Sequence, residues 1–322
     1  WGVSFTIWSS GLNSIKEFPL TVKGINKNNM SIANYGEKVF YNSDNNSASS
    51  WARKPIKNIK KIDAPQLSNP INVKQNGDGK VIEDGLGYMH NNSNNLMQSD
   101  RYVGIYSSAF SDGHGIPISK ENLMRIVALF SARKSVPRNW INDKNEFLIP
   151  DTTLEGYQLW NNDALVYSLF HVSSNQSSLR NVRYKDKKYD INNPFFFLSN
   201  EEMMFLADKY HFHDMYRDAK RFNKNSYIFE LLQTNNFSPK AKTVLDKAKN
   251  LVYHSMAFRE KYHLREPKYN LYAWDAGWYQ LRLGVIQQVG KLNEELKLFN
   301  SYFKELEDEI REGVYKYGFL KK

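Results

Sequence analysis

The stretch that decides the fold is residues 275–310, DAGWYQLRLGVIQQVGKLNEELKLFNSYFKELEDEI. Its large apolar residues recur every three or four positions, which places them on one side of a helix and is typical of a packed helix pair. They are Trp278, Leu281, Val285, Val289, Leu292, Leu296, Phe299, Phe303, Leu306 and Ile310. The pattern predicts a helix of roughly 55 Å at about 1.5 Å per residue, which Gly284 and Gly290 can bend or divide.

A second apolar stripe lies upstream of that helix and is its expected partner. It runs over residues 238–263, and Pro239 at the first helical position marks its start. Its apolar residues are Val244, Leu245, Ala248, Leu251 and Val252. We therefore expect a long helical hairpin at the end of the chain, either an ordinary core pair or an arm that docks a partner subunit.

Strands dominate the opposite end of the chain. β-branched and aromatic runs at 3–8, 18–22 and 38–41 are separated by Gly, Asn and Ser, which predicts three strands. A basic connection follows at 54–61, then a strand at 102–107 and a helix from Ser119, its expected N-cap, to about Lys134. Beyond Pro194 the chain turns helical, beginning with the capping box Ser199-Asn200-Glu201-Glu202.

These patterns predict an α+β protein in three parts. Residues 1–60 form a β-rich segment, residues 61–192 a mixed α/β recognition region, and residues 193–322 a mainly α-helical part that ends in the helical hairpin. A chain of 322 residues is long enough for more than one hydrophobic core.

The composition narrows the classes of function. Lys and Arg total 44 against 34 Asp and Glu, a net charge of +10 that suits an anionic partner or only keeps the surface soluble. The absence of cysteine excludes thiolate zinc sites and cysteine nucleophiles and fits a reducing cytoplasm. Since no apolar run approaches about 20 residues, we expect a cytoplasmic protein without a membrane partner.

One polar segment, residues 175–188, carries the side chains that meet DNA. Arg can bond guanine with two parallel N–H groups, Asn and Gln can do the same to adenine, and Ser and Lys suit phosphate oxygens. The candidate DNA contacts are Asn175, Gln176, Ser178, Arg180, Arg183 and Lys185. Arg133, Lys134 and Arg138 are expected to add phosphate contacts, although the first two also suit the end of a helix. The alternative for the whole segment is a solvated loop.

No convergent set of catalytic or metal-binding residues is evident. His211 and His213 are predicted to lie in one helix, where positions two apart point about 200° from each other and cannot share an ion. Asn193-Pro194-Phe195-Phe196 lacks the second proline of the adenine amino-methyltransferase motif, and no Gly-rich cofactor loop precedes it. We interpret the phenylalanines as core and assign no catalytic, cofactor or metal residue.

Several short sequence segments carry a family resemblance. They are Trp140-Ile141-Asn142-Asp143-Lys144, Trp160-Asn161-Asn162-Asp163, Val166-Tyr167-Ser168-Leu169-Phe170, Ser174-Asn175-Gln176-Ser177-Ser178-Leu179-Arg180 and Trp274-Asp275-Ala276-Gly277-Trp278-Tyr279-Gln280. With these, the chain resembles the C-terminal half of bacterial adenine-specific DNA methyltransferases of restriction-modification systems.

The resemblance implies the end of a methyltransferase core, with its last strands around residues 3–22, followed by a DNA-recognition region and a helical C-terminal extension. Such a segment lacks the catalytic motifs and is inactive alone. Its implied partners are double-stranded DNA and an upstream methyltransferase core, which would bind S-adenosylmethionine. A chain that opens on Trp1 looks like the downstream piece of a longer protein. The alternative is a protein-interaction module whose helical hairpin docks a partner, which Glu at Leu292 and Leu296 would disrupt. The DNA hypothesis requires Arg180 and Arg183 to face an electropositive groove.

Overall fold

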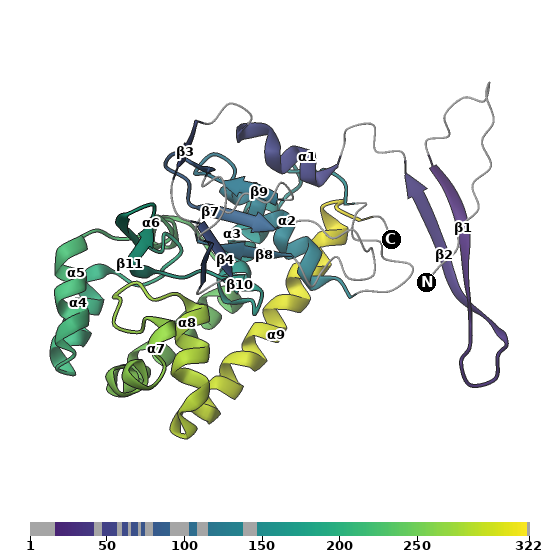
Figure 1. Ribbon diagram of the computed structural model, residues 1–322. Coiled ribbons are helices and arrows are strands. Elements are labelled where there is room, and N and C mark those ends of the chain that lie inside the picture. The colour runs from purple at the N-terminus through teal and green to yellow at the C-terminus, as the bar shows by residue number, and fades with distance from the viewer. Residues whose placement is uncertain are drawn as a thin grey trace.

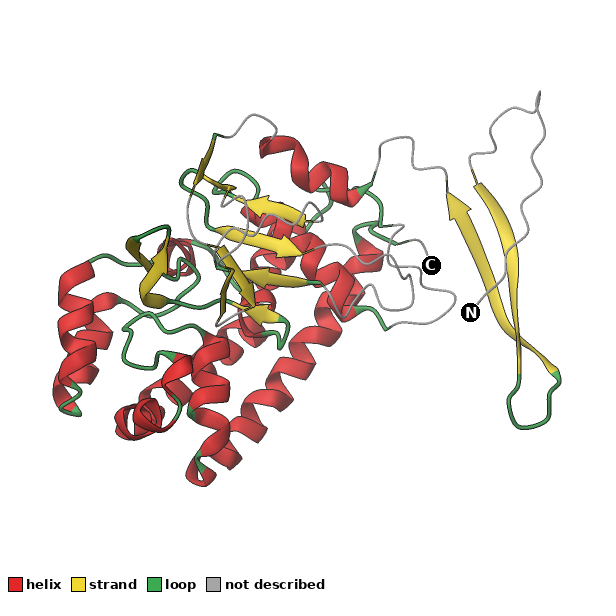
Figure 2. Ribbon diagram, in the orientation of Figure 1, coloured by secondary structure: helices red, strands yellow, loops and turns green. Residues whose placement is uncertain are grey.

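A computed structural model gives the placement of residues 17–41, 47–56, 60–63, 66–69, 72–74, 80–90, 103–107, 115–137 and 147–320. The N-terminal half contains small sheets together with three helices, and the C-terminal half is helical, which confirms the predicted α+β class (Figures 1 and 2). The first predicted strand, at 3–8, lies outside the described residues.

The described chain begins with a hairpin of β1 (Glu17–Ile25) and β2 (Ile32–Tyr41). These strands contain the predicted runs at 18–22 and 38–41. In Figure 1 the hairpin, drawn in purple, stands apart from the rest of the protein.

A four-stranded sheet forms the centre of the N-terminal half, in the order β10-β8-β7-β9. Strand β10 runs parallel to β8, and the other pairs are antiparallel. Two small antiparallel pairs, β3 with β6 and β4 with β5, accompany it. The bounds are β3 (Lys61–Asp63), β4 (Gln66–Asn69), β5 (Asn72–Lys74), β6 (Lys80–Ile82), β7 (Gly87–His90), β8 (Gly104–Tyr106), β9 (Gly115–Ile118) and β10 (Ser174–Asn175).

Three helices belong to this half: α1 (Ala48–Arg53), α2 (Leu123–Ser135) and α3 (Tyr157–Phe170). A 3-10 turn at Lys54–Ile56 begins the predicted basic connection. The prediction that Ser119 is the N-cap of α2 is wrong by three residues. Asn122 holds that position, and its Oδ1 accepts the backbone N–H of Ser119 at 2.8 Å, so Ser119 lies in the preceding turn.

A second hairpin, β11 (Leu179–Tyr184) with β12 (Lys187–Ile191), leads into the helical half. Its two turn residues, Lys185 and Asp186, have φ of 45° and 60°. Positive φ at both central residues is the geometry that matches the twist of a two-residue hairpin, although Gly or Asn fits it with less strain.

The helical half contains α4 (Asn200–Lys209), α5 (His213–Phe222), α6 (Tyr227–Thr234), α7 (Pro239–Arg265), α8 (Trp278–Gly284) and α9 (Asn293–Lys316). The predicted starts are confirmed, since Ser199 and Glu202 form a reciprocal capping box and Ser238 caps α7 ahead of Pro239. His211 ends the turn after α4 with φ of 58°, so the prediction that it shares one helix with His213 is wrong.

The stretch 275–310 does not form one straight helix. Helix α8 ends at Gly284, 3-10 turns follow at Ile286–Gln288 and Gly290–Leu292, and α9 begins at Asn293. The division falls at the two glycines that the sequence marked, because glycine costs a helix interior more than other residues except proline.

Helices α7 and α9 form the expected antiparallel pair. Lys240 lies 2.7 Å from Glu309 at one end, His254 lies 2.7 Å from Glu295, and the Tyr262 hydroxyl donates to the Gln288 carbonyl at 3.0 Å at the other end. The apolar residues between these contacts are buried, among them Val244, Ala248, Leu251, Phe299, Leu306 and Ile310. The hairpin is therefore a core pair.

One hydrophobic core joins both halves, from Ala48 to Phe319. Trp160 of α3 shows the close fit: its indole packs on Tyr317 and Phe319 near the end of the chain, and a Cβ on Gly313 would lie 2.1 Å from its Nε1. The division at residues 60 and 192 stays a prediction. None of the described helices is long and apolar enough to cross a membrane.

Candidate nucleic-acid interface

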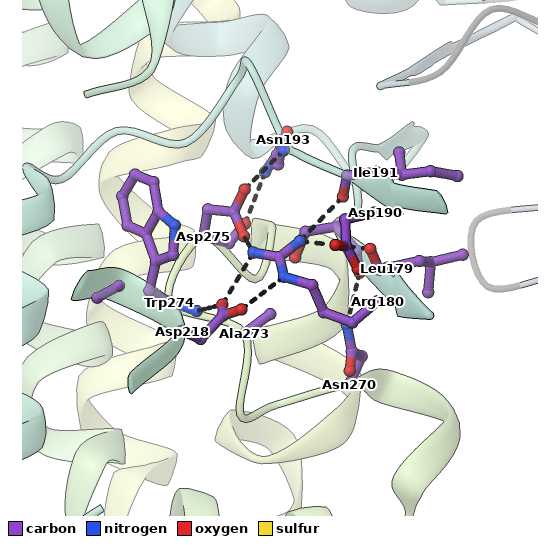
Figure 3. Close-up of polar contacts among 12 residues, drawn as sticks. Leu179, Arg180, Asp190, Ile191, Asn193, Asp218, Asn270, Ala273, Trp274 and Asp275 are labelled. Atoms are coloured by element: carbon purple, nitrogen blue, oxygen red, sulfur yellow. Dashed lines mark hydrogen bonds and ion pairs between the residues drawn. The ribbon is translucent and has the colours of Figure 1, made fainter. Parts of the chain in front are cut away.

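Arg180, the central residue of the predicted DNA segment, lies inside the protein with its side chain 1% exposed (Figure 3). Its Nε and Nη2 donate to the two oxygens of Asp218 at 2.7 and 2.9 Å, and Nη2 also donates to Asp275 Oδ1 at 2.7 Å. Its Nη1 donates to the carbonyls of Leu179 and Ile191 at 3.3 and 3.1 Å. These bonds use all five N–H groups that a guanidinium carries.

The electrostatics agree with this closed arrangement. Burial works to lower the pKa of Arg180, but Asp275 and Asp218 outweigh it and raise the pKa above its usual value. The expectation that Arg180 faces a double helix is therefore wrong, because no donor remains for a base or a phosphate.

The two carboxylates also hold backbone. Asp218 Oδ2 accepts the N–H of Trp274 at 3.0 Å, and Asp275 Oδ2 accepts the N–H of Asn193 at 2.7 Å. Burial raises the pKa of Asp275, and Arg180 opposes that shift. Strand β11, helix α5 and the chain before α8 are thus joined around one cation (Figure 3).

Gln176 and Ser178 are also buried, at 1% and 0% exposed. Gln280 Oε1 accepts the N–H of Ser178 at 2.9 Å, and its Nε2 donates to the Ser178 carbonyl at 2.8 Å. A Cβ on Gly277 would lie 1.9 Å from the Gln176 carbonyl oxygen, so the two segments touch through backbone. The prediction that Gln176 and Ser178 contact DNA is wrong because burial keeps both side chains away from the surface, and Asn175 is half-buried beside them.

The predicted phosphate contacts Arg133 and Lys134 lie away from Arg180. Arg133 is 3% exposed and Lys134 half-buried in the last turn of α2, whose end is capped by Arg311 of α9 through the Ser135 carbonyl at 2.6 Å. Figure 1 shows α2 near the centre of the protein and α5 at its edge. Arg138 lies outside the described residues.

The tip of the β11–β12 hairpin remains at the surface. Lys185 Nζ lies 2.6 Å from Asp63 Oδ2, and the Tyr184 hydroxyl donates to Asp63 Oδ1 at 2.7 Å. These bonds, that of Lys185 first, lower the pKa of Asp63 and hold the strained turn against β3. Lys185 is exposed but engaged.

One face of this hairpin gathers basic charge. Arg183 and Lys188 are exposed and are register partners across the hairpin, so they point to the same face. Asp190, two residues beyond Lys188, shares that face, because alternate side chains of a strand do. Asp190 Oδ2 lies 2.6 Å from Arg221 of α5, so this ion pair connects the hairpin to the cations of that helix.

Helix α5 adds a second row of cations. Arg217 and Arg221, one turn apart, are exposed and line a cavity of about 390 Å³ that also reaches Asn181 of β11. Arg217 pairs with Asp214 on its own helix. We call Arg183, Lys188, Arg217 and Arg221 the basic face.

Of the residues that the sequence predicted to contact DNA, Arg183 belongs to the basic face. Arg217 and Arg221 were not among the predicted residues. The signal was present: Arg217, Lys220, Arg221 and Lys224 follow the spacing of one helix side. Among the described residues, no group of three or more His, Asp and Glu side chains is placed to hold a metal ion.

No model of a protein family matches the chain, and neither does a curated protein or a solved structure.

Proposed function

We propose that this chain contacts duplex DNA through the basic face, as the DNA-recognition and C-terminal segment of an S-adenosylmethionine-dependent adenine methyltransferase of a restriction-modification system. The observation that carries the DNA contact is the placement of Arg183 opposite Lys188, with Arg221 paired to Asp190 of the same strand pair. Like charges directly opposite each other destabilise a strand pair. A polyanion bound across them removes that penalty.

The position of the basic face supports the proposal further. Arg180 and Asp218 line the same cavity as Arg217 and Arg221, and the ion pair of the first two joins β11 to α5, so the cations stand on elements that are fixed relative to each other. Fixed cations hold a phosphate backbone in a defined register. Asn181, exposed next to the face, carries an amide of the kind that pairs with adenine edges.

Methyl transfer in this proposal belongs to a methyltransferase core that binds S-adenosylmethionine. The chain itself supplies the DNA-binding surface. Alone, it is expected to bind duplex DNA without methylating it.

The competing function, docking of a partner by the helical hairpin, has less support. Leu292 is 3% exposed, and the apolar stripes of α7 and α9 are covered by each other and by α3. Glu at Leu292 would therefore unfold the core rather than release a partner.

The test is a titration of a short duplex followed by fluorescence anisotropy at about 50 and about 200 mM salt. Affinity should fall steeply with salt. The double variant R183Q/K188Q should bind at least about tenfold more weakly at low salt, and its salt slope should be smaller by roughly two, because each phosphate contact contributes about one.

The matched control is K249Q/K261Q, which removes the same charge from α7. Affinity that is indifferent to salt, or equal losses in the two double variants, would overturn the proposal.

A further inference from the structure

A second cavity, of about 530 Å³, lies next to the Arg180 network. Most of its lining comes from the chain after β12 at Asn193, the chain between α5 and α6 at Lys224 and Tyr227, and the chain before α8 at Trp274. Gly85 and Ser107 of the N-terminal half complete it. Arg221 lines both this cavity and the one described above, so the two are neighbours.

The cavity changes in chemistry from its rim to its floor. Arg221, Lys224 and Asn225 at the rim are exposed, and two of them are cationic. Asn193 and Trp274 at the floor are 2% and 3% exposed. A ligand that fits this gradient carries an anionic group at one end and a planar, partly apolar group with polar edges at the other.

Trp274 contributes an unused donor at the floor. Its indole is fixed edge-on against Phe196, with ring centroids 5.5 Å apart, and its backbone N–H is held by Asp218. Its Nε1 is buried and has no hydrogen-bond partner among the described residues. A buried N–H without an acceptor is costly, so the site favours a ligand whose edge presents a ring nitrogen or a carbonyl oxygen.

Aromatic rings stand between floor and rim. Tyr227 and Phe222 both line the cavity. Cations lie over both rings: Lys120 is 4.8 Å from the Tyr227 ring, and Arg180 and Arg221 are 4.4 and 5.0 Å from the Phe222 ring. Aromatic side chains of this kind stack on nucleobases irrespective of sequence, because every base has a π-face.

We propose that this cavity binds a single nucleotide, with the base among Trp274, Phe222 and Tyr227 and the phosphate at Arg221 and Lys224. The nucleotide is either free or an unpaired nucleotide of bound DNA. Only the second source rests on the proposed function. Both present the same chemistry, an acceptor-bearing base edge and a phosphate one sugar away.

The first experiment measures binding of a free nucleotide. AMP is titrated into the chain by calorimetry, with adenosine and inorganic phosphate as separate probes. AMP should bind more tightly than either part. W274F, which keeps a ring but removes the N–H, and K224Q should each weaken AMP binding by about tenfold, whereas K261Q on α7 should leave it unchanged.

The second experiment measures binding of an unpaired nucleotide within DNA. A duplex with one unpaired nucleotide is compared with its fully paired counterpart. Tighter binding of the first duplex, with that preference lost in W274F and K224Q, supports an unpaired nucleotide as the occupant. Binding of the paired duplex, which depends on Arg183 and Lys188, reports the proposed function separately.

Two results would overturn the nucleotide site. One is that AMP binds no better than phosphate while both duplexes bind equally. The other is that AMP binding is the same in K224Q, a surface change that leaves the fold intact, as in the unaltered chain. Thermal unfolding of W274F shows whether its loss of binding comes from a lost fold, in which case K224Q decides.

Discussion

Arg180 Nη2 lies 2.7 Å from Asp275 Oδ1, although the two residues are 95 positions apart in the chain. Both side chains are 1% exposed. Burying charges costs free energy that their attraction only partly returns, so such a pair is a weak source of stability. Its consequence is geometric: it fixes β11 against α5 and the chain before α8, and so sets where the basic face lies.

Replacement of Arg180 by Gln should lower the free energy of unfolding by about 3–5 kcal/mol, because Asp218 and Asp275 would be left buried without their cation. R180K should also destabilise the protein, since a lysine cannot form the forked bonds of a guanidinium. Urea denaturation measures both. R183Q, three residues along and exposed, should stay within about 0.5 kcal/mol of the unaltered protein. Equal stability of R180Q and R183Q would contradict a structural role for Arg180.

Gly277 allows the segments 174–180 and 274–280 to touch. G277A would place a Cβ 1.9 Å from the Gln176 carbonyl oxygen, so the backbone must shift and stability should fall by about 1–3 kcal/mol. G290A is the matched control, because a Cβ there meets nothing within 4 Å, and it should be neutral or slightly stabilising. Denaturation midpoints compare the two. A similar loss in both variants would show that close approach is not the cause.

His263 should make stability depend on pH. Burial lowers its pKa below the usual 6.5, Arg259 acts in the same direction and Asp214 opposes them. The unfolded chain therefore takes up a proton first as pH falls. This contribution to stability is complete above pH 6.5 and is lost as pH falls through 6.5 towards the folded pKa. H263Q should flatten the dependence of the urea midpoint on pH in this window. An unchanged dependence would exclude His263 as its source.

Asp63 should hold the tip of the β11–β12 hairpin. Its pKa is lowered from 3.8, first by the bond from Lys185 and then by that from Tyr184. This contribution is present above pH 3.8 and lost as pH falls through the lowered value. D63N should speed amide exchange at residues 184–187 without a large change in global stability, because the contact is at the surface. E83Q, which breaks the exposed pair with Lys60, is the control and should leave the tip unchanged.

Local signals in the sequence predicted much of the helical half. The Ser199 capping box and the Ser238-Pro239 start depend on residues within four positions, and both are confirmed. The burial of Phe195, Phe196 and Phe197 followed from their apolar character alone. The sequence did not determine whether the helix ends at Gly284. Glycine only weakens a helix, and the surrounding packing determines whether the helix stops there.

The polar segment shows the limit of such reasoning. Its Gln, Ser and Arg side chains were assigned to DNA because they have the donors that DNA requires. In the protein Gln176, Ser178 and Arg180 are buried, and the donors of Arg180 bind carboxylates and carbonyls. Three of the residue phrases behind the methyltransferase resemblance include Trp160, Arg180 and Gln280, which are all buried. These phrases thus describe packing at least as much as contact with a ligand.

The sequence by itself determined where α4 and α7 begin, which side of α7 and α9 is apolar and that the chain carries excess positive charge, since these properties depend on residue type and short-range spacing. Only the tertiary structure decided which cations are at the surface. Arg180 and Arg183 are three residues apart in one strand, but Arg180 meets Asp218 and Asp275 and Arg183 meets solvent. The two aspartates that bury Arg180 lie 38 and 95 residues away from it in the chain, so no local sequence pattern could indicate them.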